Sequence, residues 1–386
     1  MNVLTQELAQ SIVSRTMKII NRNINVMDHN GMIIGSGDSS RIGKIHDGAV
    51  QVIEKRAMIA IVEDQVKALK GTKPGVNLAI MFQGEIAGVI GITGPPDEVE
   101  KYSELVKMGA ELSLEQAFLT EQIQWEERLK EDMINQIILG DPFEDILFKE
   151  RARRMAIDLR VNRIAIVVEI SLNSSKSVEL EFQRFWSNIH SQLATFLQKE
   201  DLVARISPNK LVILKTVITR EGSVNTAYLK QVMEEILNRI SSSQFTCKAA
   251  LGKFYPNFEE MKYSYDTAKA TLKVGKVLSP TTSSYLYQDY AFPVLVSDFQ
   301  LTDKHRELVD RYEGLILHDT KGELLETLQC YVHENGDVTK TANRLFIHRN
   351  TLGYRLNRIT ELTKRDPRKI QDLLELYTAM LLSKLK

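Results

Sequence analysis

Residues 337–362, DVTKTANRLFIHRNTLGYRLNRITEL, have the most informative spacing of polar and apolar side chains in the sequence. Asp337 is a favourable N-cap for a short helix, and the chain then breaks at residues 347–348. A second helix follows, with apolar side chains on one face at i, i+4 and i+7: Leu352, Leu356 and Ile359. Two helices joined by a three- or four-residue turn are typical of a DNA-binding helix-turn-helix.

The polar side chains of this stretch suggest two kinds of DNA contact. Arginine can donate two parallel hydrogen bonds to a guanine edge, and lysine and arginine also bind phosphates. We expect the outer face of the second helix and its start to read the bases, through His348, Arg349, Asn350, Thr351, Tyr354, Arg355 and Arg358. We expect phosphate contacts from Lys340, Arg344, Lys364 and Arg365. The alternative is an amphipathic helical hairpin whose charged face is only solvated.

The distribution of charge favours DNA binding. The 386 residues contain 50 basic and 50 acidic side chains, so the formal net charge is zero. Residues 336–386, however, contain 11 basic and 5 acidic side chains, whereas residues 1–135 contain 14 and 19. A basic C-terminal segment attached to an acidic N-terminal one indicates that only the C-terminal segment contacts nucleic acid.

Residues 35–49, GSGDSSRIGKIHDGA, form a candidate site for a small carboxylic acid. We expect a helix to begin near Gly43, so that free N–H groups and the positive end of the helix dipole lie beside Arg41, which can bind a carboxylate. Residues 71–77 could supply further donors. The candidate effector-binding residues are Ser36, Gly37, Arg41, Ile42, Gly43, Lys44, Ile45, His46, Gly75 and Asn77. The alternative is a glycine-rich surface loop with a solvated arginine.

The elements around this loop predict a small sensor domain over residues 1–135. An amphipathic helix is followed by two hairpins, the first turning at Asn30-Gly31 and the second at Gly84, with helices over about 43–55 and 63–70 between them. This order predicts a PAS/GAF-like α/β sensor, with an antiparallel sheet and its helices on one face. From about residue 99 to 139 the apolar spacing predicts a long coupling helix that also dimerises the chain. The alternative is two ordinary helices.

The remaining elements predict two further domains. Residues 140–290 read as a βαββαβ chain with helices over about 178–198, 224–240 and 257–274, which predicts a ferredoxin-like middle domain. From residue 302 the pattern is helical, with breaks at Gly336, at 347–348 and at Pro367. We therefore expect an α+β multidomain protein whose residues 298–386 form an all-α DNA-binding domain.

The search for catalytic and metal sites is negative. No Walker A phosphate loop, HExxH or GxSxG motif occurs, and Cys330 with His333 supplies only two metal ligands. We expect no enzymatic activity, no catalytic residues, no metal and no cofactor. Two cysteines indicate a reducing compartment, and no apolar run is long enough to span a bilayer. A cytoplasmic protein without a membrane partner is the prediction.

The sequence resembles a known family over nearly its whole length. SRTMKIINRNINVMD, GMIIGSGDSSRIGKIHDGA, GVNLAI and GEIAGVIGITG are similar to the sugar-diacid recognition domain of the carbohydrate diacid regulators. TANRLFIHRNTLGYRLNRITELT resembles the C-terminal helix-turn-helix that this family shares with the purine-catabolism regulators. The resemblance implies a bacterial transcription activator that responds to glucarate, galactarate or glycerate and binds double-stranded operator DNA as a dimer.

The middle segment is similar to the degenerate GGDEF-like domain of the same family. In a working cyclase the central hairpin holds metal and nucleotide, but the corresponding turn here is SPNK, residues 207–210. This turn lacks the paired glycines and the adjacent acids, which implies an interaction or spacer role. Two alternatives remain, a nucleotide-cyclase-like signalling enzyme and a signalling adaptor whose C-terminal helices contact protein instead of DNA.

Overall fold

The computed structural model describes residues 4–140, 145–173, 195–219, 223–298 and 303–385, with a few residues between 173 and 195. The helix expected over about 178–198 lies partly outside the described residues. The chain forms two compact units, Met1–Leu129 and Lys130–Lys386, which are described in turn. Among the described residues, no helix is both long enough and apolar enough to cross a membrane.

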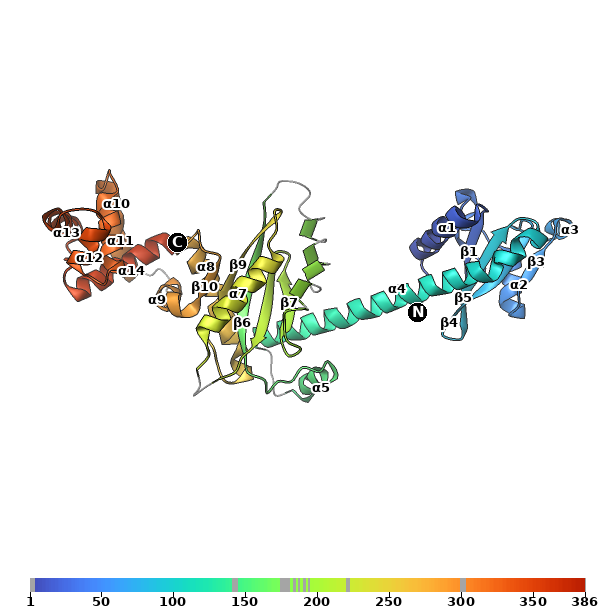
Figure 1. The fold of residues 1–386 in the computed structure, drawn as a ribbon, viewed down its shortest axis with the longest axis horizontal. Coiled ribbons are helices and arrows are strands. Elements are labelled where there is room, and N and C mark those ends of the chain that lie inside the picture. The colour runs from blue at the N-terminus through green and yellow to red at the C-terminus, as the bar shows by residue number, and fades with distance from the viewer. Residues whose placement is uncertain are drawn as a thin grey trace. The chain divides into compact units, whose positions relative to one another are not determined.

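The first unit is built on an antiparallel sheet with the strand order β2-β1-β5-β4-β3 (Figure 1). Both predicted hairpins are present, and Gly31 and Gly84 have the positive φ angles that their turns require, 78° and 85°. The three-residue strand β3 was not predicted. The strands are β1 (Ile24–Asp28), β2 (Ile33–Ser36), β3 (Ile59–Ile61), β4 (Gly75–Phe82) and β5 (Glu85–Thr93).

Helices cover both faces of this sheet, so the expectation that they lie on one face is wrong. Helix α1 (Gln6–Ile20) and the start of α4 (Pro96–Leu139) pack on one face, over Val26, Leu78 and Ile90. Helix α2 (Asp47–Lys55) packs on the other face, over Met27 and Val89. Short helices η1 (Ser39–Arg41) and α3 (Glu63–Val66) flank α2 in the chain.

Helix α4 is continuous over 44 residues, as the apolar spacing of residues 99–139 predicted. At its beginning Val99, Val106 and Ala110 belong to the core of the first unit. At its end four residues belong to a core of the second unit: Met133, Ile134, Ile137 and Ile138. Each end of the helix therefore contributes to a hydrophobic core.

The second unit contains another five-stranded sheet, with the order β10-β9-β6-β8-β7. Its strands are β6 (Arg163–Leu172), β7 (Leu202–Ser207), β8 (Lys210–Thr216), β9 (Phe245–Leu251) and β10 (Ser284–Leu286). Helix α7 (Thr226–Ile240) covers one face. The other face is covered by α5 (Ile146–Arg154), the end of α4, η2 (Phe258–Glu260) and α8 (Met261–Leu278). Because β6 lies between two covered faces, its residues 163–168 are all buried.

The described part of the chain after β10 is helical. Its helices are α9 (Tyr287–Ser297), α10 (Asp303–His318), α11 (Glu323–His333), α12 (Val338–Arg344), α13 (Arg349–Thr363) and α14 (Ile370–Leu385). The last five surround a core that includes Tyr312, Leu328, Leu356 and Met380. Gly336 adopts a positive φ of 76° between α11 and α12, as a helix-ending glycine does.

Candidate functional site

Arg41 is the principal candidate for contact with an effector in the first unit. It ends η1, which Asp38 caps, and its side chain is buried at 7% relative exposure. Its Nη2 donates a hydrogen bond to the carbonyl oxygen of Gly71. Its Nη1 is buried and has no hydrogen-bond partner among the described residues. Burial lowers the pKa of Arg41, which the charge of Asp38 opposes. A buried donor of this kind is costly unless an acceptor reaches it.

His46 supplies a second buried donor. It is the N-cap of α2, and its Nδ1 accepts a hydrogen bond from the backbone N–H of Ala49 at 3.2 Å. The neutral ring therefore carries its proton on Nε2. Burial, followed by the positive charge of Arg41, lowers the pKa of His46 to about 4. At neutral pH His46 is therefore an uncharged hydrogen-bond donor beside a cation.

Asn77 of β4 lies close to the His46 ring. A Cβ added to Gly48 would lie 3.0 Å from Cε1 of His46 and 3.3 Å from Nδ2 of Asn77, so both side chains lie against this glycine. Asn77 is buried, and its Nδ2 makes only a long contact, 3.5 Å, with the carbonyl of Ile59. The structure thus places the polar groups of His46 and Asn77 together, close enough to Arg41 for its charge to act on His46.

The backbone around Gly43 differs from the expectation. Helix α2 begins at Asp47 rather than near Gly43, because Gly43 has a φ of +81° and His46 is the residue that caps the helix. The amides of Gly43 and Lys44 already donate to the carbonyls of Ile33 and Arg41, at 2.8 and 3.2 Å. The prediction that these amides are free at a helix N-terminus is therefore wrong.

The other predicted effector residues have varied surroundings. Ser36 donates to Oδ1 of the buried Asn25 at 2.7 Å, and Gly37 lies against Met17 and Asn23. Gly75 packs directly on the backbone of Ile92, where no side chain would fit. Ile42 is half-buried, whereas Lys44 and Ile45 are exposed. Their roles in binding stay predictions.

Sequence reasoning missed Asn25 of this region, and it did not single out Gly48 and Gly71, although both lie within the two candidate segments. Gly48 could have been noticed, because glycine weakens the first turn of a helix unless a neighbour must approach closely.

In the C-terminal helices, the predicted helix-turn-helix is present as α12, a turn and α13. Asp337 caps α12 by accepting from the amide of Lys340 at 2.9 Å. In the turn, Phe346 adopts a φ of 54° and is 95% exposed. His348 then caps α13. The polar residues predicted to read bases and found exposed are His348, Arg349, Asn350, Thr351, Tyr354 and Arg358. Of these, Arg358 forms an ion pair with Glu361 at 2.7 Å on the same helix.

Arg355 does not belong to this exposed face. Its Nη2 lies 3.0 Å from Oε2 of Glu323, its Nη1 donates to Oγ1 of Thr327 at 3.3 Å, and its side chain is only 13% exposed. Both partners belong to α11. The prediction that Arg355 lies on the outer face with the base-reading residues is therefore wrong, because the side chain turns toward the neighbouring helix.

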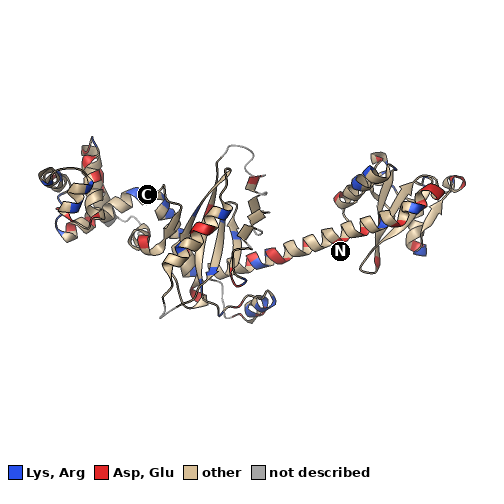
Figure 2. Ribbon diagram, viewed as in Figure 1, with Lys and Arg blue, Asp and Glu red and all other residues tan. Residues whose placement is uncertain are grey.

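Three of the four predicted phosphate-binding residues form ion pairs within the domain, and Lys340 pairs with Asp337 at 4.0 Å. Arg344 forms an ion pair with Glu334 at 2.6 Å, and Arg365 forms ion pairs with Glu375 and Asp372. Lys340 and Lys364 are exposed. Figure 2 shows acidic residues among the basic ones along the ribbon of these helices. The positive charge available to DNA is thus smaller than the composition of the segment suggested.

Comparison with known proteins agrees with this arrangement. Residues 4–137 match the family described as sugar diacid recognition, residues 139–274 the GGDEF-like domain and residues 324–382 the PucR C-terminal helix-turn-helix domain. The carbohydrate diacid regulator of Escherichia coli strain K12 is 37% identical over 98% of this chain and 97% of its own. An uncharacterized protein of Haemophilus influenzae is 35% identical over 98% of this chain and 99% of its own.

Among solved structures, a regulator of polyketide synthase expression from Bifidobacterium adolescentis is 16% identical, with a TM-score of 0.32 over 66% of this chain and 92% of its own. The domains and the relatives together identify the class of protein. A helix-turn-helix and a ligand-recognition domain lie on one chain, and the similar protein of Escherichia coli is a regulator, so this chain is a transcription regulator and not an enzyme. The chain belongs to the carbohydrate diacid regulator family.

Proposed function

We propose that this chain is a transcription activator that responds to a sugar acid of the glycerate, glucarate or galactarate class and controls genes for its uptake and catabolism. The observation that supports this proposal is the buried Nη1 of Arg41, which has no acceptor among the described residues. A carboxylate is the strongest acceptor for a guanidinium. The Nε2–H of His46 and the amide of Asn77 suit the hydroxyl groups of the same molecule.

The rest of the predicted effector site is part of the proposal. Most of these residues are close to Arg41 and His46 in the sequence, namely Ser36, Gly37 and residues 42–45. Gly75 lies on the strand β4, which also carries Asn77. We infer that side chains from this set contact further hydroxyl groups or a second carboxylate. The amides of Gly43 and Lys44 are not included, because they are already bonded.

The regulator acts as a homodimer through α4. Other residues of this helix are buried in the first unit, but seven of its large apolar residues are at least half exposed: Leu105, Met108, Leu112, Leu119, Ile123, Trp125 and Leu139. Leu105, Met108 and Leu112 follow the three- and four-residue spacing of a coiled-coil seam. A second copy of the chain is the natural cover for this stripe, because dimers read paired half-sites on DNA.

The domain assignments of the proposal follow the predicted boundaries. Residues 1–135 are the PAS/GAF-like sensor, with the coupling helix from about residue 99. Residues 140–290 are the ferredoxin-like, degenerate GGDEF-like domain, and residues 298–386 bind double-stranded operator DNA in the cytoplasm. Effector binding changes DNA binding through α4. The size of this change is limited by the difference between the effector's affinities for the DNA-binding and non-binding states of the regulator.

A combined ligand and DNA experiment tests the function. Glycerate, glucarate and galactarate are screened with the full chain by thermal shift, and a ligand at 100 times its Kd adds about 2.7 kcal/mol of stability. Gel shifts with DNA upstream of the gene then measure affinity with and without that ligand. We expect one sugar acid to stabilise the chain and to change its DNA affinity. If no sugar acid stabilises it, the effector class is wrong.

A further inference from the structure

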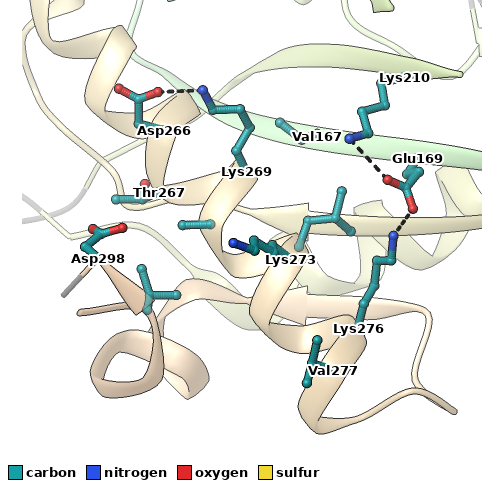
Figure 3. A pocket seen from close by; sticks show the side chains of 13 residues that line it. Val167, Glu169, Lys210, Asp266, Thr267, Lys269, Lys273, Lys276, Val277 and Asp298 are labelled. Atoms are coloured by element: carbon teal, nitrogen blue, oxygen red, sulfur yellow. Dashed lines mark hydrogen bonds and ion pairs between the residues drawn. The ribbon is translucent and has the colours of Figure 1, made fainter. Parts of the chain in front are cut away.

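A pocket of about 910 Å³ lies in the GGDEF-like part of the second unit, away from Arg41 in the sequence. Its walls are the strands β6 and β8, helix α8, and residues Val294 and Asp298 in and after α9 (Figure 3). Four lysines line it: Lys210, Lys269, Lys273 and Lys276. Neither the helix-turn-helix nor the effector site uses these side chains.

Two of the lysines share one carboxylate. Nζ of Lys210 lies 3.2 Å from Oε2 of Glu169, and Lys276 contacts the other oxygen, Oε1. Burial acts in the opposite direction, but the hydrogen bonds from Lys276 and Lys210 hold the pKa of Glu169 below its usual value. Because both oxygens of Glu169 face an ammonium group, they are not open to a divalent cation, and the trio retains one positive charge.

Lys273 adds a second positive charge to the pocket. Lys269 is paired with Asp266 at 3.0 Å, whereas Lys273 makes no ion pair with any described residue. Figure 3 shows the Lys273 ammonium pointing toward the side of the pocket where Asp298 lies, away from Glu169, with no interaction drawn to it. The four lysines and the three acids Glu169, Asp266 and Asp298 leave one uncompensated positive charge in the pocket. This charge suits an anionic ligand such as a phosphate monoester, whose oxygens accept charged hydrogen bonds.

The size and remaining lining of the pocket indicate an organic ligand. Ligand pockets have volumes of about 300–1,000 Å³ and combine apolar walls with a few polar groups. This pocket is at the upper end of that range, and several of its lining residues are apolar: Val167, Ala270, Leu272, Val277 and Val294. An inorganic ion would occupy only a small part of it.

We propose that this pocket binds an organic phosphate, with the phosphate among Lys273, Lys276 and Lys210 and the body of the molecule against the apolar wall. The site is independent of the sugar-acid site, because it shares no residue with it. No turnover is implied, since the proposal concerns binding alone.

Calorimetry on the full chain tests the proposal. The probes are ATP, ribose 5-phosphate, inorganic pyrophosphate and glucarate. Lys273→Ala is the test variant, and Lys230→Ala, an exposed lysine of α7 on the other face of the same sheet, is its matched control. We expect ATP or ribose 5-phosphate to bind, and Lys273→Ala to weaken that binding by roughly tenfold or more, as for the loss of one charged hydrogen bond. Lys230→Ala should bind unchanged.

Several results would overturn the proposal. One is that neither ATP nor ribose 5-phosphate binds. Another is that Lys273→Ala binds the organic phosphate as tightly as the unmodified chain does. A third is that pyrophosphate binds as tightly as the organic phosphates. Glucarate binding that Lys273→Ala weakens would also contradict it, because the ligand class would then be a sugar acid. Sugar-acid binding that depends on Arg41 but not on Lys273 leaves the regulatory function intact, so the two proposals can fail separately.

Discussion

Arg41 in the sensor and Arg355 in the DNA-binding helices are both largely withdrawn from solvent, but their guanidinium groups have different surroundings. Arg355 contacts a carboxylate and a hydroxyl of α11. Arg41 contacts one backbone carbonyl, and its other terminal nitrogen is without a partner among the described residues. An arginine whose bonds are satisfied inside the fold holds helices together, whereas one with a missing acceptor is available to a ligand.

The largest effect expected from this comparison is on the pH dependence of the sensor. The pKa of His46 falls from 6.5 to about 4 in the folded state, because the ring is buried and faces Arg41, with Asp47 opposing. The unfolded chain therefore binds more protons between these values, and the free energy of unfolding decreases as pH falls from 6.5 to 4, by up to about 3 kcal/mol. Urea unfolding at pH 5, 6 and 7 measures it.

His46→Gln is the control for that measurement. The variant cannot gain the proton, so the difference in unfolding free energy between it and the unmodified chain should shrink as the pH is lowered. A difference that stays constant over this range would show that His46 is as easily protonated in the folded chain as in the unfolded one.

The next effect is on ligand affinity. Arg41→Ala should weaken sugar-acid binding by about 10- to 100-fold, since the carboxylate loses a charged hydrogen-bond donor worth roughly 1.5–3 kcal/mol. Arg56→Ala is the matched control, because Arg56 follows α2 and is exposed, pairing with Glu85 at 3.3 Å. Calorimetry with the sugar acid found in the screen gives both values. If the two variants bind the sugar acid with equal affinity, Arg41 does not contact it.

A smaller effect is expected at Arg355. Arg355→Ala should destabilise the C-terminal helices by about 1–2 kcal/mol, because it removes the contacts that join α13 to α11. Relative affinities for different operator sequences should stay unchanged wherever the domain is folded. Chemical unfolding and competition gel shifts separate these outcomes. A change in sequence preference without a loss of stability would show that Arg355 contacts bases.

The smallest effects concern the exposed face of α13. Arg358→Ala should lower discrimination between operator and unrelated DNA by about 1 kcal/mol or more. Lys364→Ala should weaken binding to all sequences alike and reduce the salt slope by about one. Competition gel shifts at several salt concentrations measure both. Identical behaviour of the two variants would contradict the division into base and phosphate contacts.

Much of the architecture followed from apolar spacing, which is a local property. The two hairpins of the sensor, the continuous α4 and the helix-turn-helix were all predictable, because their turns and faces repeat regularly. The strands β3 and β10 were not, since three residues carry too little pattern. Arg355 was misplaced for a different reason. It borders the apolar face of α13, and only the position of α11 decides which way its side chain turns.

The candidate effector site was predicted as a set of residues but not as a geometry. Residue types identified Arg41 and His46 as candidates. However, Gly43 has a positive φ and α2 begins only at Asp47, and the amides of Gly43 and Lys44, which we expected to be free, already donate hydrogen bonds to backbone carbonyls. The hydrogen bond from Gly43 forms because β2 lies beside this loop. The spacing of residues in the sequence does not predict that contact.

Gly48 and Gly71 limit how this site can change in evolution. A Cβ at Gly48 would lie 2.5 Å from Cδ1 of Ile61, and one at Gly71 would lie 2.2 Å from the carbonyl oxygen of Ile45. The contact at Gly71 is with main chain, so a side chain there would require the backbone to move, whereas the contact at Gly48 is with the end of a side chain. Substitution at neighbouring side chains such as Ile61 can therefore change the shape of this region, whereas Gly71 cannot gain a side chain without movement of the segment that holds Ile45.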